Sequence, residues 1–158
     1  MERVNWIWNH PVYQEHLRRT VEAEKNRMFC RHTPEHFLDT ARLCYIFCLE
    51  AGISVDKELI YAAALLHDVG RYRQYEEGIP HEKASLAIAV SLLPECGFTE
   101  EETARIADAI DGHRKPADAA DFRSLFYRAD KASRSCYLCE AEPLCDWSPE
   151  KKNLSIEY

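Results

Sequence analysis

The sequence predicts an all-α fold, a compact bundle of about six helices with an irregular C-terminal tail. Apolar residues recur at the three-to-four-residue spacing of helices that bury one face. No segment shows the sustained two-residue alternation that is typical of strands. The 158 residues, 46% hydrophobic and 30% charged, suffice for one domain with its own core. We therefore expect a single domain over residues 1–158, with a helical core at about residues 30–135 and a tail over 136–158.

The first two expected helices precede the most apolar part of the chain. One spans Pro11 to Met28 and is rich in Glu, Arg and Lys. The next begins at Thr33-Pro34, with Thr as N-cap and Pro at the first helical position. It runs to about Glu50 and stops near Gly52. The buried stripe of this second helix is expected to consist of Phe37, Leu38, Ala41, Tyr45 and Cys48.

The third and fourth helices form the centre of the predicted core. Asp56 can cap the third, which passes through an apolar run at residues 62–66 and ends near Gly70. Because this run is apolar on nearly every side, we expect it to be the most buried helix. The fourth begins at Pro80 and ends before Pro94.

The last two helices lead into the tail. Thr99 and Glu102 form a capping box for the fifth helix, which extends to about Asp111. The sixth starts near Asp121 and continues through Ser135. The residues that follow include two prolines and three cysteines, which predicts an irregular segment.

Charge and cysteine content exclude several classes of protein. A net charge of -7 disfavours a nucleic-acid partner, which requires a basic face. No run of 18 apolar residues exists, so we expect no membrane span, and the first ten residues lack the apolar core of an export signal. The expected location is therefore the cytoplasm. There, an odd number of cysteines, seven, predicts thiols or metal ligands and not disulfides.

One dipeptide stands out by its position. His67-Asp68 closes the most apolar helix, where an ionised carboxylate needs a metal or a cation as partner. Imidazole with carboxylate is a natural ligand set for a divalent ion such as Mn, Fe, Ni, Co or Zn. The simpler alternative is a core histidine that a hydrogen bond satisfies.

Three segments in order carry a resemblance to a known family. They are His36-Phe-Leu-Asp-Thr-Ala-Arg42, Ala62-Ala-Ala-Leu-Leu-His-Asp-Val-Gly-Arg71 and Ala129-Asp-Lys-Ala-Ser-Arg134. Over about residues 30–135 the chain resembles the HD-domain superfamily of metal-dependent phosphohydrolases. The resemblance implies that His36, His67, Asp68 and Asp130 hold a divalent metal ion.

Two more histidines extend the resemblance. His81 and His113 stand where members that hold two ions complete the second ligand set, a pattern closest to the branch that hydrolyses symmetrical diadenosine polyphosphates. Asp68 would then bridge one ion to the other. The alternative for both histidines is a supporting or surface role. The remaining histidines lack such a context and are expected at the surface: His10, His16 and His32.

Cations near the implied ligands are candidates for gripping phosphate oxygens. Arg71 follows the His-Asp pair through Gly70, Lys131 neighbours Asp130, and Arg134 lies one helical turn further. Lys83 and Arg114 follow the two additional histidines and are weaker candidates, since any of these cations could simply be a solvated surface charge. The expected catalytic residues are His67, Asp68, Arg71 and Lys131.

The cysteines pose a separate question. Cys44 and Cys48 are four residues apart on an apolar face, which favours core packing. Cys136-Tyr-Leu-Cys139 followed by Cys145 is spaced like a metal site, and Cys30 is the expected fourth ligand. This group would be a structural zinc site or an iron–sulfur cluster. The alternative is a set of ordinary thiols in a packed tail.

Together these patterns predict a metal-dependent phosphohydrolase that uses one or two ions, among Mn, Fe, Ni, Co, Zn and Mg, to activate hydroxide. The expected partner is a nucleotide or a related small phosphate ester or anhydride. Two alternatives stay open: a single-metal (deoxy)nucleoside monophosphate nucleotidase, and a weakly catalytic regulatory domain that senses a nucleotide or metal. Trp6, Ile7 and Trp8 could pack on the core or on a second subunit, which leaves a homodimer open.

Overall fold

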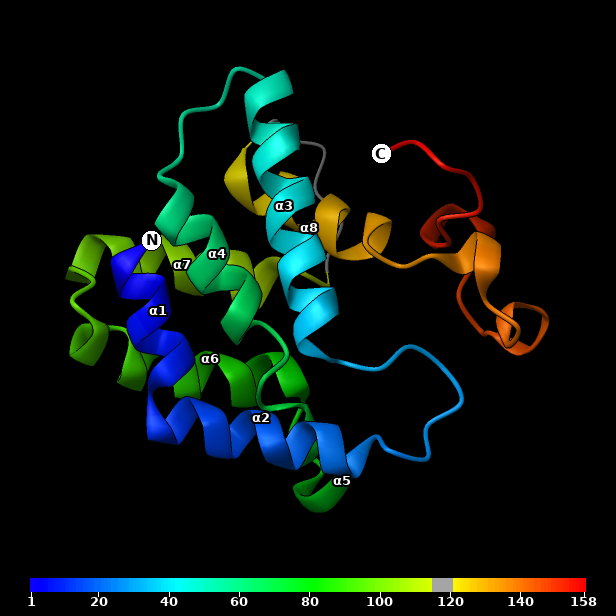
Figure 1. Ribbon diagram of the computed structural model, residues 1–158, viewed down its shortest axis with the longest axis horizontal. Helices are drawn as coiled ribbons and strands as arrows, with labels where there is room; N and C mark the ends of the chain where they lie inside the picture. Colours follow the sequence, from blue (N-terminus) through cyan, green and yellow to red (C-terminus); the bar gives the residue numbers. More distant parts are fainter. Residues whose placement is uncertain (115–120) are drawn as a thin grey trace.

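The computed structural model describes residues 1–114 and 121–158, and its α-helices surround one core (Figure 1). The described helices are α1 Glu2–Asn9, α2 Pro11–Ala23, α3 Pro34–Glu50, α4 Lys57–Leu66, α5 Arg71–Glu77, α6 His81–Leu92, α7 Glu100–Gly112 and α8 Phe122–Ala132. The all-α prediction is confirmed. The six expected helices correspond to α2, α3, α4, α6, α7 and α8, and two short helices, α1 and α5, join them.

The boundaries differ from expectation where tertiary contacts intervene. α1 buries only Val4 and Ile7, too few residues for a helical period to show in the sequence. α2 ends at Ala23 and not at Met28, because the buried carboxylate of Glu24 accepts hydrogen bonds from the following loop. α5 is a seven-residue, mostly polar helix, and helices this short carry little periodic signal.

The core is built around α4, as expected. Its run of Ala and Leu at residues 62–66 is buried throughout. The small alanines of α4 allow α3 and α7 to approach α4 closely. α3 also packs along α8. In Figure 1, α3 and α8 lie side by side next to α4, and α6 lies below them beside α7. This packing points the ends of several helices toward one region.

Gly70 allows the turn after α4 to lie against α6. A Cβ atom there would lie 2.7 Å from the backbone nitrogen of Ser85 and 2.8 Å from the backbone carbon of Ala84. The Gly70 N–H instead donates to Ser85 Oγ at 3.0 Å. The close approach brings the end of α4 next to the beginning of α6.

The two ends of the chain are attached differently. At the N-terminus, Ile7 is fully buried in the core and Trp6 is half exposed. The tail after α8 consists of 3-10 turns at Cys136–Leu138, Glu142–Leu144 and Pro149–Lys151, which confirms the irregular segment. In Figure 1 it projects from the helices on the side of the loop before α3. Among the described residues, no helix is long and apolar enough to span a membrane.

Candidate metal centre

Four of the expected ligands converge from three helices. His36 lies in the first turn of α3, His67 caps the C-terminus of α4 with Asp68 next to it, and Asp130 lies near the end of α8. All four side chains are buried, and one ligand atom from each lies within 4.8 Å of the others. The packing of α3 against α4 and α8 thus gathers residues that are up to 94 positions apart in the sequence.

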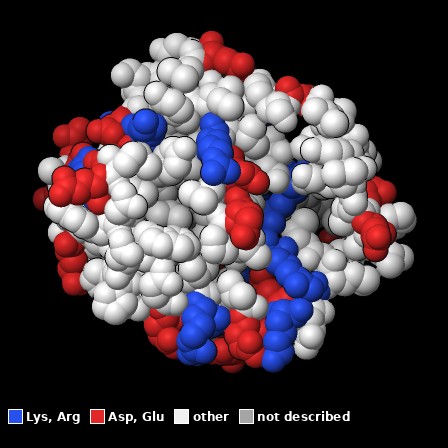
Figure 2. All heavy atoms as spheres, viewed as in Figure 1, with Lys and Arg blue, Asp and Glu red and all other residues white. Residues whose placement is uncertain are grey.

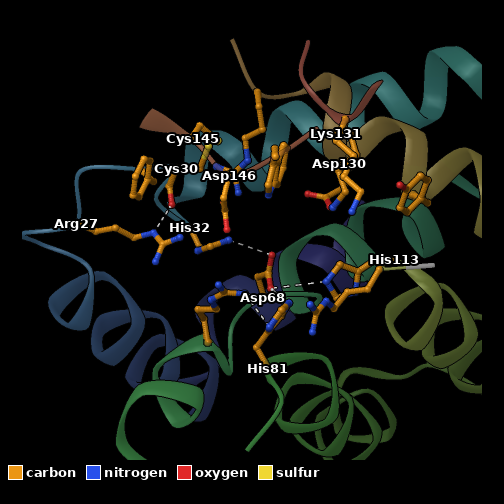
Figure 3. A pocket seen from close by; sticks show the side chains of 17 residues that line it. Arg27, Cys30, His32, Asp68, His81, His113, Asp130, Lys131, Cys145 and Asp146 are labelled. Carbon is orange, nitrogen blue, oxygen red and sulfur yellow. Dashed lines mark hydrogen bonds and ion pairs between the residues drawn. The ribbon is translucent and has the colours of Figure 1, made fainter. Parts of the chain in front are cut away.

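A second group shares one of these carboxylates. His81, the first residue of α6, and His113, at the end of α7, lie with Asp68 in a buried set whose ligand atoms are also within 4.8 Å. Their Nε2 atoms are 3.3 Å and 3.8 Å from Asp68 Oδ1. Figure 3 shows Asp68 between these two histidines on one side and His32 on the other. Asp68 is therefore placed to contact both groups.

The inward-facing atoms of this centre lack hydrogen-bond partners in the described part of the chain. They are His36 Nε2, His67 Nε2, His113 Nε2 and Asp68 Oδ1. Buried polar atoms are nearly always hydrogen-bonded, because leaving one unpaired costs about 1–3 kcal/mol. Unpaired imidazole and carboxylate atoms that face one another fit a divalent metal ion. The chemistry and burial of these residues therefore fit a centre that holds a divalent metal ion.

The opposite ring nitrogens are held by hydrogen bonds that orient these rings. Nδ1 of His67 donates to the carbonyl of Ala64 at 2.8 Å, and Nδ1 of His113 to that of Ile110 at 2.5 Å. Nδ1 of His36 contacts Ser133 Oγ at 2.9 Å. Metal-binding histidines commonly use the second nitrogen in this way, which directs the Nε2 lone pair to the ion.

Titration of the centre follows from burial and mutual charge. Burial lowers the pKa of His36 and of His81 to about 3, so both rings are neutral at pH 7. Burial also acts to lower the pKa of His67, but Asp68 and Asp130 outweigh it and raise that pKa to about 9. The pKa values of both carboxyls lie well below their usual range despite burial. Without metal, a proton on His67 offsets part of this negative charge.

His32 was expected at the surface, and the structure corrects this expectation. Its side chain is buried, Nδ1 contacts Glu24 Oε1 at 2.7 Å, and Nε2 lies 3.4 Å from Asp68 Oδ2. Glu24 also accepts from the His32 backbone N–H at 2.7 Å and from the Tyr75 hydroxyl at 2.6 Å. The available sequence signal was the closeness of His32 to His36. Nothing local indicated Glu24, which reaches the centre only through the fold.

Cations surround the pocket above the centre. Figure 2 shows Lys and Arg side chains along a hollow beside the tail. Among the described residues, six cations line the pocket, Arg27, Arg71, Arg114, Lys131, Arg134 and Lys151, against three acids, Asp68, Asp130 and Asp146. Because two of these acids belong to the candidate metal ligands, the rest of the described pocket wall is strongly positive. Such a wall suits an anionic ligand.

The structure brings most of the expected cations to this pocket. Nζ of Lys131 is 2.6 Å from Asp130 Oδ2, and Arg71 Nη1 lies 3.1 Å from His81 Nε2. Arg134 is largely buried and donates to the carbonyl of Arg31 at 2.7 Å, so it also anchors the preceding loop.

Lys83 and Arg114 differ in outcome. Lys83 is absent from the described pocket lining and points to the surface, where Nζ lies 2.6 Å from Asp111 Oδ1. The reason is helical geometry, because a residue two positions after His81 lies roughly 200° around the helix. Arg114 does line the pocket, and its guanidinium lies 3.4 Å from Glu82.

Comparison with known proteins identifies the family of this chain. The sequence pattern of the family described as "HD domain" matches residues 33–145. The chain belongs to the HD domain family. An uncharacterized protein of Clostridium beijerinckii is 43% identical over 158 residues and covers all of both chains. This HD domain also shares its fold with a crystal structure described as a predicted HD superfamily hydrolase from an uncultured Thermotogales bacterium. The TM-score is 0.62 at 22% identity, over 98% of this chain and 88% of the other.

Part of the pocket of this HD domain was not anticipated. Tyr127 on α8 and the tail residues Asp146 and Trp147 line it. The Lys131 ammonium lies 5.3 Å from the centre of the Tyr127 ring and 5.1 Å from that of Trp147. These aromatic residues carry no ligand-like spacing, so only the packing of α8 and of the folded tail shows that they line the pocket.

Proposed function

We propose that this HD domain is a metal-dependent phosphohydrolase that cleaves a nucleotide or a related small phosphate ester or anhydride. The carrying observation is that Asp68 is shared by two buried ligand groups beneath a cation-lined pocket. A carboxylate that contacts two ions is the arrangement used for hydrolysis at phosphorus. The positive wall suits the phosphate oxygens.

The proposed ligand sets follow from the two groups. His36, His67, Asp68 and Asp130 would hold one ion, and Asp68, His81 and His113 a second. The candidate ions are Mn, Fe, Ni, Co, Zn and Mg. When bound, such ions lower the pKa of water and offset charge on phosphoryl oxygens.

We assign roles in binding and orientation to other residues of the pocket. Arg71 and Lys131 are placed next to the ligands, where they would bind phosphate oxygens, and the planar guanidinium of Arg71 favours a two-point contact. Glu24 holds His32 by Nδ1 and so directs its Nε2 toward Asp68 and the pocket. Tyr127 and Trp147 offer aromatic faces to a nucleobase.

The test is hydrolysis by purified protein loaded with Mn or Fe. The substrate panel contains nucleoside mono-, di- and triphosphates, diadenosine polyphosphates and simple phosphate esters. His67→Ala and Asp68→Asn should lose activity and the metal bound at this centre. His16→Gln, at a half-buried histidine that stacks on Tyr72 away from the centre, should retain both. Activity that survives both ligand substitutions would refute the proposal.

The second ligand group favours two ions over the single-metal nucleotidase. His81→Ala and His113→Ala should each reduce the metal content by about one ion and lower activity, while His36→Ala affects the other ion. One ion per chain besides any metal bound by the cysteines, unaffected by either substitution, would instead support the nucleotidase. Stoichiometric metal with tight nucleotide binding but no turnover of the panel would support the regulatory alternative.

A further inference from the structure

A small pocket lined by cysteines lies beside the cation-lined pocket above the metal centre, called the catalytic pocket below. Cys30, from the loop before α3, and Cys136, Cys139 and Cys145, from the tail, all line it together with the apolar side chains of Phe29 and Trp147. None of the four cysteines forms a disulfide. Residues more than 100 positions apart thus present four thiols to one small space.

The local backbone explains why the tail cysteines share a side. The N–H of Cys139 donates to the carbonyl of Cys136 at 3.1 Å, that of Glu142 to Cys139 at 3.0 Å, and that of Cys145 to Glu142 at 3.0 Å. Within one 3-10 turn, side chains three positions apart point in similar directions, and Cys139 and Cys145 each follow such a turn. Cys136, Cys139, Glu142 and Cys145 all line the pocket.

Cys30 is brought to this group by a contact between segments. Arg134, just after α8, donates to the carbonyl of Arg31 at 2.7 Å and so ties the tail to the loop that carries Cys30. Burial raises the pKa of the Cys136 thiol, and the other three cysteines raise it further, as expected for sulfurs that face one another. Nζ of Lys152 lies 2.8 Å from Glu142 Oε1 and neutralises the one acid among them.

The tail also lacks an apolar core that could hold it in place. From residue 136 to the end, only Cys136 and Ala141 are buried. The large hydrophobic cluster of the domain contains none of the four cysteines. Small segments without a core commonly depend on disulfides or a metal for their fold. A group bound by the four sulfurs would supply this support.

The spacing of the cysteines favours an iron–sulfur cluster over zinc. Three cysteines near one another with a fourth far away resemble cluster ligation, whereas structural zinc sites commonly use two close pairs. A tetrahedral zinc ion would draw its sulfurs to about 3.8 Å from one another, given bonds of about 2.3 Å. Among the described residues, no three of these four sulfurs lie within 4.8 Å of one another. This spacing is wider than the spacing that a single zinc ion requires.

We propose that Cys30, Cys136, Cys139 and Cys145 bind an iron–sulfur cluster that fixes the tail against the helical domain. This site is separate from the metal centre at Asp68, but it adjoins the catalytic pocket. Cys30 and Cys145 line both pockets, and Asp146 and Trp147, which follow Cys145, line the catalytic one. Figure 3 shows Cys30 and Cys145 on the same side of that pocket as Asp146. The cluster would therefore hold one wall of the active site.

The test measures iron, zinc and acid-labile sulfide per chain in full-length protein purified without oxygen. The wild type should contain iron and sulfide and absorb visible light. Cys139→Ala and Cys30→Ala should lose the sulfide and the absorption. Cys96→Ala, a buried cysteine outside the pocket, should keep both. His67→Ala should lose metal from the other centre but retain the sulfide.

Two further readouts keep the result interpretable. Circular dichroism should show that the cysteine variants keep their helices, because the helical core does not include these residues. Limited trypsin digestion should cut Cys139→Ala faster than the wild type near Lys151 and Lys152. No sulfide in the wild type, even after incubation with iron and sulfide, would overturn the proposal. So would stoichiometric zinc that is lost with Cys139→Ala, or sulfide that survives Cys30→Ala.

Discussion

Proton competition at His67 provides a quantitative test of the metal centre. In the metal-free protein, Asp68 and Asp130 outweigh the effect of burial and raise the pKa of His67 to about 9. A histidine must be neutral to bind a metal, so uptake of the ion must displace this proton. We predict that the apparent metal affinity rises with pH from 6 until it levels off near pH 9.

The expected magnitude follows from the pKa. At pH 7 the ring lies about two pH units below its pKa, and each unit corresponds to about 1.4 kcal/mol. Metal binding at pH 7 is therefore weaker by about 3 kcal/mol, or about a hundredfold, than with a neutral ring. The slope should approach tenfold in affinity per pH unit between pH 6 and 8, with release of about one proton per ion.

The free energy of unfolding of the metal-free protein should change with pH in the opposite direction. The His67 pKa is raised above its unfolded value near 6.5, so protonation stabilises the metal-free fold fully below pH 6.5. That contribution, about 3 kcal/mol, is lost as pH rises through 9.

The assay is calorimetric titration with Mn of protein whose metal has been removed by a chelator and the chelator then dialysed away. It is carried out at several pH values, in buffers of different ionisation enthalpy. Urea unfolding with chelator present gives the stability. A metal affinity that does not change between pH 6 and 8, with no proton release, would show that His67 is neutral in the free protein and refute the electrostatic account.

Three other substitutions test the surrounding structure. Gly70→Ala should destabilise the fold by about 1–3 kcal/mol in urea unfolding, because the new methyl group would meet the backbone of α6. Glu24→Gln should be less stable at pH 7, since one oxygen cannot replace both that contact His32. The pKa of Glu24 is lowered to about 2, as its bonds to His32 outweigh burial, so this stabilisation is present above about pH 4.5. The deficit of the variant should therefore shrink from pH 4.5 to 2. Lys131→Ala should raise KM for the phosphorylated substrate in steady-state assays, because its ammonium lines the pocket.

Each of these has a matched comparison. Gly112→Ala should cost less than Gly70→Ala, because its methyl group would meet the movable side chain of Arg123. Equal costs would show that the close approach at Gly70 is not limiting. A constant Glu24→Gln deficit down to pH 2 would contradict the depressed pKa. Lys83→Ala, at a surface lysine paired with Asp111, should leave KM unchanged, and an effect equal to that of Lys131→Ala would argue against a specific phosphate contact.

The sequence alone determined the fold class and indicated the residues that gather at the candidate metal centre. The helical period, the caps at Thr33 and Thr99 and the apolar run at residues 62–66 are local signals, because they depend on neighbours within one or two turns. The ligand motifs are local too, since each lies at a helix end next to a short characteristic segment. These features can therefore be recognised from the sequence without knowledge of the fold.

Tertiary structure decided which side chains meet. The roles of His32 and Glu24 arise from a loop folded back on α2, and Trp147 reaches the pocket only because the tail lies beside α8. The outward direction of Lys83 depends on which face α6 buries. Such contacts are set by how helix faces pack, and sequence separation carries little information about that packing. The sequence indicated the chemistry at Asp68, and the fold decided which residues surround it.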